Sequence, residues 1–67
     1  MAKWRIYIVM KGGLKQYVKD GMGHLLTSDK KESFCFFSRE TADEVLCRAV
    51  RYSAYIPIKA GVTKYEH

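Results

Sequence analysis

The histidines and cysteines of this 67-residue chain could in principle bind a metal, and they are His24, Cys35, Cys47 and His67. Consecutive members of this set are 11, 12 and 20 residues apart. Metal sites of this kind bring two ligands close in sequence, as in Cys-x-x-Cys or His-x-x-x-His pairs. The chain contains neither pair, so the sequence predicts no metal site and no other cofactor.

The same residue types give no catalytic arrangement. A nucleophile needs a base and a third group that orients the base, and His24 is flanked by glycine and leucine in an expected loop. The carboxylates Glu40, Asp43 and Glu44 suit the first turns of a helix, where they interact favourably with its dipole. Because no pair stands out as general acid and base, we predict that the chain is not an enzyme.

The charges of the chain are unevenly distributed. Twelve Lys and Arg residues against seven Asp and Glu give a formal charge of +5. Residues 1–31 contain seven cations and two anions, whereas residues 32–67 contain five of each. A basic patch attracts polyanions or acidic protein surfaces, although lysines also serve simply to solvate strands and protect sheet edges. Both interpretations remain open for the first half of the chain.

Length and composition predict one compact domain over residues 1–67. The 48% hydrophobic and 13% aromatic content argues against disorder. A domain of about this size buries only about 60% of the surface exposed by its unfolded chain, which leaves little room for a deep active site. We therefore expect a module that works through its surface.

The chain has the features of a cytoplasmic protein. It begins Met-Ala-Lys without an apolar signal segment, so we expect both cysteines to be reduced. The longest apolar runs, at residues 6–10 and 34–37, fall far short of the roughly 20 residues that span a bilayer. The sequence predicts no membrane partner.

The first half of the chain predicts a β-hairpin. Residues 4–10 and 16–19 have the aromatic and β-branched composition of strands, and Gly12-Gly13 between them favours a two-residue turn. That turn places Ile8 opposite Tyr17 and Tyr7 opposite Val18, with the side of Ile6, Ile8 and Met10 in the core. The glycine clusters at residues 12–13 and 21–23 precede no helix, so we interpret them as turns and not as phosphate-binding loops.

The rest of the chain predicts a short strand, a central strand, a helix and a closing strand. Residues 24–27 suit a short strand or a bulged continuation of the second strand, residues 28–32 a polar turn, and the aromatic residues 33–37 a central, covered strand. Ser38 suits an N-cap. The helix that follows carries a narrow apolar stripe of Ala42, Val45, Leu46, Ala49, Val50 and Ser53.

The last extended stretch runs from residue 55 to residue 65. Pro57 lacks an N–H and suits an edge or the start of a strand, and Ala60-Gly61 is expected to interrupt the stretch. The predicted fold class is α+β: an antiparallel or mixed sheet of three to four strands in the order β-β-β-α-β, with one helix packed on one face. The other face of the sheet is predicted to be open.

That open face is the first candidate binding surface. The predicted register places on it Arg5, Tyr7, Val9, Lys11, Gln16 and Val18. On sheets that bind single-stranded nucleic acids, rings stack on bases and cations hold phosphates. The chain has no aromatic ribonucleoprotein motif and no GXXG clamp, and tyrosine and valine also suit pleated surfaces in general.

Residues 32–65 have the order of an aromatic strand, the helix start Ser-x-Glu-Thr-x-Asp-Glu-x-Leu at residues 38–46, and a closing strand. This order resembles small bacteriophage-encoded proteins that inhibit host enzymes, and loosely the phage inhibitors of bacterial RNA polymerase. The resemblance implies a binding protein of mobile-element type in the host cytoplasm. In that family, cations on the last strand contact an acidic patch of the polymerase. Lys64 stands where such a cation is expected, and Glu66 where a second would be.

The leading prediction is a non-enzymatic module that inhibits or modulates a host macromolecule by protein–protein contact. Its partner would be a host protein with an acidic surface, with RNA polymerase as one candidate. Direct nucleic-acid binding through the same surface is the alternative, and self-association through an exposed strand edge is a third. The residues predicted to make the contacts are Arg5, Tyr7, Lys11, Lys15 and Lys64.

Overall fold

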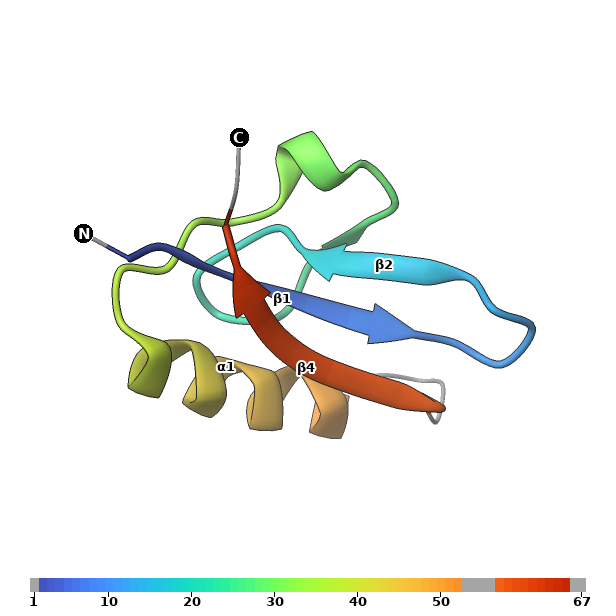
Figure 1. Cartoon of the computed structure of the whole chain (residues 1–67). Helices are drawn as coiled ribbons and strands as arrows, with labels where there is room; N and C mark the ends of the chain where they lie inside the picture. The colour runs from blue at the N-terminus through green and yellow to red at the C-terminus, as the bar shows by residue number, and fades with distance from the viewer. Residues whose placement is uncertain (1, 53–56, 66–67) are drawn as a thin grey trace.

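A computed structural model describes residues 2–52 and 57–65 of the chain (Figure 1). The elements are β1 (Trp4–Val9), β2 (Lys15–Val18), β3 (Leu26–Thr27), the 3₁₀ helix η1 (Lys30–Glu32), α1 (Arg39–Tyr52) and β4 (Lys59–Lys64). The strands form one sheet in the order β3-β2-β1-β4, and all neighbouring strands are antiparallel. The predicted α+β class is confirmed.

The sheet separates two unequal layers. Figure 1 shows α1 on one side of the sheet and η1 on the other. The core lies between α1 and the sheet, because the buried apolar side chains come from both. They are Ile6, Ile8, Met10, Val18, Phe36, Ala42, Val45 and Ala49. The predicted core side of β1 is therefore confirmed.

The register of the β1–β2 hairpin differs from the prediction by one residue. The Met10 N–H donates to the Leu14 carbonyl at 2.7 Å, and the Gly13 N–H donates to the Met10 carbonyl at 3.0 Å. The loop therefore has three residues, 11–13, and Tyr7 lies opposite Tyr17. Three-residue loops are a common hairpin class with a glycine at positive φ, and Gly12 and Gly13 have φ values of 96° and 88°.

This shift exchanges the two faces of β2, because successive side chains of a strand point to opposite faces. Val18, expected on the open face, is fully buried in the core. Tyr17, expected opposite Ile8, lies opposite Tyr7 on the face away from α1. The prediction of a two-residue loop was wrong because the pair Gly12-Gly13 fits a two-residue and a three-residue turn equally well.

The predicted central strand at residues 33–37 is also wrong. The segment forms no strand, and its one β-bridge joins Phe36 to Trp4, with each N–H donating to the other's carbonyl. Phe36 is buried, whereas Phe37 is 68% exposed. β2 ends at Val18, and beyond that point Phe36 lies beside β1. The third strand of the sheet is instead Leu26–Thr27, within the residues predicted as a short strand.

The helix agrees with its predicted pattern. Ala42, Val45 and Ala49 are buried, and Leu46 packs partly against the core. Ser38 accepts a hydrogen bond from the Thr41 N–H at 3.4 Å, the N-cap arrangement. Val50 is more exposed than the stripe predicts, and Ser53 lies outside the described residues.

The closing strand is continuous where an interruption was expected. β4 pairs with β1 from Lys59 opposite Val9 to Lys64 opposite Trp4, and Ala60 and Gly61 lie within this ladder. The Tyr7 ring lies against Gly61, and a Cβ at this position would come within 2.8 Å of the Tyr7 hydroxyl oxygen. A glycine therefore fits here without displacing the ring. Pro57 precedes the strand, and residues 55–56 of the predicted stretch lie outside the described part of the chain.

The loop after β2 anchors the sheet to the helix. The Asp20 carboxylate accepts hydrogen bonds from the N–H groups of His24 and Leu25 at 2.9 and 3.0 Å. Gly23, at φ 82°, packs so closely on α1 that a Cβ would lie 3.1 Å from the Val45 carbonyl oxygen. This loop therefore depends on a carboxylate and on a glycine.

The contact of Gly23 predicts a large effect of a single methyl group. Gly23→Ala should lower the free energy of unfolding by about 2–3 kcal/mol, since positive φ alone costs a non-glycine residue about 1–2 kcal/mol and the new Cβ also meets backbone. Gly13→Ala is the matched control, because Gly13 has a similar φ but open space around it, and should cost only about 1 kcal/mol. Urea denaturation measures both, and equal losses would contradict the packing role.

Asp20 predicts a contribution to the pH dependence of stability. Partial burial raises its pKa, but the surrounding backbone N–H groups, from Leu25 and His24 among others, outweigh burial and hold the pKa below its ordinary value of 3.8. A lowered pKa in the folded state stabilises the protein above the ordinary pKa, and this stabilisation is lost as the pH falls through the lowered value. Unfolding free energies measured from about pH 5 to pH 2 should therefore fall less steeply for Asp20→Asn than for the wild type. Identical slopes would contradict this role.

Candidate binding surface

The sheet face away from α1 presents its side chains in rows across three strands. One row contains Val9 between Lys15 of β2 and Lys59 of β4. The next contains Tyr7 between Tyr17 and Gly61. Since residues opposite one another share a face, this end of the sheet displays two lysines beside two tyrosines. Lys11, in the adjoining hairpin loop, is exposed. We call Lys11, Lys15 and Lys59 the basic end.

No carboxylate among the described residues belongs to the segments that form the basic end. Every described Asp and Glu lies between Asp20 and Glu44. The hairpin precedes that stretch, and β4 follows it. Residues 45–65 carry four cations, Arg48, Arg51, Lys59 and Lys64, and no acid. The basic end therefore combines lysines from both halves of the chain.

The tyrosines of this face hold the lysine that projects over them. The Lys15 ammonium nitrogen lies 5.0 Å from the centroid of the Tyr7 ring and 5.7 Å from that of Tyr17. Cation–π contacts of this kind contribute about 0.5–1 kcal/mol at exposed sites. Tyr17 is only 8% exposed, and Tyr7 rests against Gly61. Tyr17 therefore presents little free ring surface, and the half-buried Tyr7 ring is flanked by Gly61 and Lys15.

Arg5 lies on the same face but at the other end, and it is only 3% exposed. Its Nε donates a hydrogen bond to the Ser33 hydroxyl at 2.8 Å. Its guanidinium carbon lies 4.2 Å from the Tyr65 ring centroid and 5.8 Å from that of Tyr17. No carboxylate of the described residues forms a salt bridge with it. Two aromatic rings and a hydroxyl group thus hold a buried cation.

The segment around η1 covers Arg5. Ser33 follows η1 directly, and its hydroxyl donates to the Lys30 carbonyl at 2.7 Å while it accepts from Arg5. The Phe34 N–H donates to the Val18 carbonyl, which ties the segment to the end of β2. A salt bridge of 3.2 Å joins Lys19 to Glu32. The η1 segment therefore covers the Arg5 end of the face, whereas the lysines of the basic end are exposed.

The five residues predicted as contacts do not form one cluster. Lys11 and Lys15 are exposed at the basic end, and Tyr7 is half-buried beneath Lys15. Arg5 is buried under Ser33. Lys64 is exposed at the far end of β4, opposite Trp4 and on the α1 side of the sheet. Their role in binding stays a prediction, and their positions single out Lys11 and Lys15.

Sequence reasoning missed Lys59 and Tyr17. Tyr17 was assigned to the core by the wrong hairpin register. Lys59 belongs to a half of the chain whose total charge is zero, but its acids are concentrated before residue 45 apart from Glu66. Counting acids along residues 45–65 would have revealed the basic segment.

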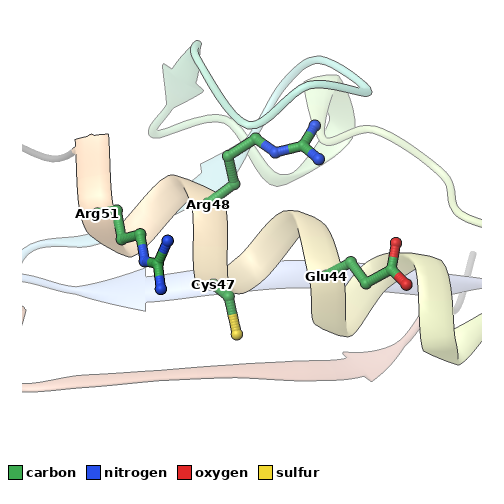
Figure 2. Close-up of a pocket in the computed structure, with 4 residues that line it drawn as sticks. All are labelled: Glu44, Cys47, Arg48 and Arg51. Carbon is green, nitrogen blue, oxygen red and sulfur yellow. The ribbon is translucent and has the colours of Figure 1, made fainter.

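A shallow hollow lies on the outer side of α1. It is lined by Glu44, Cys47, Arg48 and Arg51 (Figure 2). Cys47 is an exposed free cysteine, and Cys35 is free and half-buried. In the described part of the chain, no three His, Cys, Asp or Glu residues gather in a way that could hold a metal ion. None of the described helices has the length and apolar character to cross a membrane.

The buried hydrogen bond of Arg5 predicts strong coupling to Ser33. Ser33→Ala should lower the free energy of unfolding by about 1–3 kcal/mol, because it leaves the Arg5 Nε buried without its acceptor. Arg5→Met removes the donor and keeps a long side chain. In urea denaturation, Arg5→Met should cost less in the Ser33→Ala background than in the wild type, with a coupling of about 1 kcal/mol. Simple additivity of the two losses would show that the bond contributes nothing.

A scan against protein-family models and searches of curated proteins and of solved structures found no match to this chain. The resemblance of residues 32–65 to phage-encoded inhibitors stays a prediction.

Proposed function

We propose that this chain is a non-enzymatic binding module that contacts an acidic surface of a partner protein through its basic end. The observation that carries the proposal is the grouping of Lys11, Lys15 and Lys59 on segments without any acid among the described residues. Such a cluster steers an acidic surface towards it and favours the correct orientation on encounter.

The packing of the tyrosines favours a protein partner over a nucleic acid. Bases stack on exposed ring faces, but Tyr17 is almost fully buried and the Tyr7 ring lies between Gly61 and the Lys15 ammonium group. Lys15, which lies over the Tyr7 and Tyr17 rings, instead suits a carboxylate group, because a cation that is already positioned binds at lower entropic cost. Nucleic-acid binding is the alternative, and the capture experiment distinguishes it from protein binding.

The resemblance to phage-encoded inhibitors suggests where to look for the partner. The partner would be a protein of a bacterial host, and an enzyme such as RNA polymerase is one candidate. Inhibition would then result from occupation of the partner's acidic surface. Lys64, the cation implied by that resemblance, lies at the opposite end of β4 from Lys59, so a partner that reached both would extend along the whole strand.

The proposal predicts capture of a protein that depends on the basic end. The immobilised chain is incubated with nuclease-treated bacterial lysate, and bound proteins are quantified by mass spectrometry. Lys11→Glu combined with Lys15→Glu should reduce the captured partner at least about tenfold, equivalent to about 1.4 kcal/mol. Circular dichroism verifies that the variant is folded.

The matched control is Lys30→Glu combined with Lys31→Glu. It changes the net charge equally, but on η1, where both lysines are exposed. The control should retain the partner within about twofold. Equal losses of captured partner in both variants would show that capture depends on net charge alone and would contradict a role of the basic end. A bound fraction that disappears with nuclease and with a steep salt dependence would replace the proposal with nucleic-acid binding.

A further inference from the structure

The two edges of the sheet are very different. β3, at one edge, has two residues and leads directly into the turn before η1. β4, at the other edge, has six residues and pairs with β1 on one side only. No strand formed by residues 2–52 or 57–65 pairs with its outer side. Figure 1 shows β4 as the outermost strand, with α1 under it and β1 behind it.

The hydrogen-bond pattern fixes which backbone groups of β4 point outward. The backbone N–H and C=O groups of the even residues of β1 point towards β2 and towards residues 33–37. The hydrogen bonds of Met10 to Leu14 and of Trp4 to Phe36 show this direction. The odd residues of β1 therefore face β4, in agreement with the bond from the Ile58 N–H to the Val9 carbonyl. In an antiparallel ladder, the alternate residues of the edge strand point away. Ala60, Val62 and Lys64 thus direct their N–H and C=O groups outward.

The side chains of β4 leave that edge accessible. Its four middle residues are small: Ala60, Gly61, Val62 and Thr63. Natural sheets commonly protect an edge with prolines, bulges or charges along the strand. Here Pro57 stands before the strand, and the charges are confined to its first and last residues, Lys59 and Lys64. The middle of the edge has none of these protections.

The charges at the ends of β4 select the occupant. Two lysines five residues apart attract an extended segment that carries carboxylates at both ends. A second copy of β4 carries the same two lysines and would offer them no carboxylate. The absence of acids from described residues 45–65 further favours an acidic segment over another β4.

We propose that the outer edge of β4 accepts an acidic, extended segment of a partner protein as a fifth strand. Main-chain bonds to Ala60, Val62 and Lys64 supply the attachment, and Lys59 and Lys64 provide the preference for acidic flanks. This is the β-augmentation mode of peptide recognition. The inference rests on the proposed function in that it specifies how the acidic partner is bound.

A defined peptide tests this mode. The probe is a fluorescein-labelled peptide of alternating Val and Thr with two Glu residues at each end, and the comparison peptide has Lys in place of Glu. Fluorescence anisotropy with the wild-type chain should show binding of the Glu peptide at least about tenfold tighter than that of the Lys peptide. Failure of the Glu peptide to bind at millimolar concentration, or equal binding of both peptides, would overturn the proposal.

The edge itself is tested with Ala60→Pro. Proline is tolerated in an edge strand where the N–H faces outward, so this variant should retain the fold and lose binding of the Glu peptide at least about tenfold. Ala60→Ser is the matched control, because it keeps the N–H, and it should bind like the wild type. Unchanged binding by folded Ala60→Pro would overturn the proposal.

Amide hydrogen exchange gives a readout that needs no variant. On addition of the Glu peptide to the wild-type chain, the amides of Ala60, Val62 and Lys64 should become protected at least about tenfold, whereas those of Gly61 and Thr63, which already face β1, should change little. Protection confined to another surface would overturn the assignment. Dimers of the free chain that dissociate in Ala60→Pro, detected by sedimentation, would show that a second copy is the occupant and overturn it as well.

The two proposals fail separately. If the lysate partner depends on Lys11 and Lys15 but binds Ala60→Pro normally, the proposed function stands and the edge mode falls. If the Glu peptide binds β4 but no protein is captured through the basic end, the edge mode stands and the proposed function falls.

Discussion

The register of the β1–β2 hairpin determines which side chains the rest of the molecule can use. The bond from the Met10 N–H to the Leu14 carbonyl closes a three-residue loop, and from there every residue of β2 is committed to one face. A shift by one residue would move Val18 out of the core and Tyr17 into it. The core under α1 would lose a fully buried side chain, and Lys15 would leave the tyrosines that hold it. One turn thus sets both the packing and the basic end.

The second constraint is the burial of Arg5. Removing a cation from water is costly unless polar groups replace the water, and here the replacements come from three separate segments: Tyr17 of β2, Ser33 after η1 and Tyr65 after β4. The guanidinium group therefore connects the covering segment to both strands that flank β1. The same constraint explains why η1 lies over this end of the face and leaves the other end to the lysines.

How far the sequence predicts this molecule depends on how local each feature is. The helix stripe and the buried side of β1 were predicted because periodicity within one element encodes them. The hairpin register was not, because a pair of glycines permits loops of two or three residues. The segment 33–37 was misassigned because three phenylalanines suggest a covered strand, whereas only Phe36 is buried. The burial of Arg5 depends on Ser33, 28 residues away, a pairing that no local pattern contains.

The polarity of the molecule follows from the demands of its elements. α1 places Glu40 in its first turn and Arg51 in its last, as the helix dipole favours, and Asp20 is required as an acceptor in the loop that packs on α1. The described acids therefore lie in the middle of the chain, between residues 20 and 44. The charged residues of the hairpin and of β4 are all cations. Because β4 begins at the same end of the sheet as the hairpin loop, the lysines of both segments converge there. The outer edge of β4, with which no strand of the described residues pairs, therefore starts where the positive charge is concentrated.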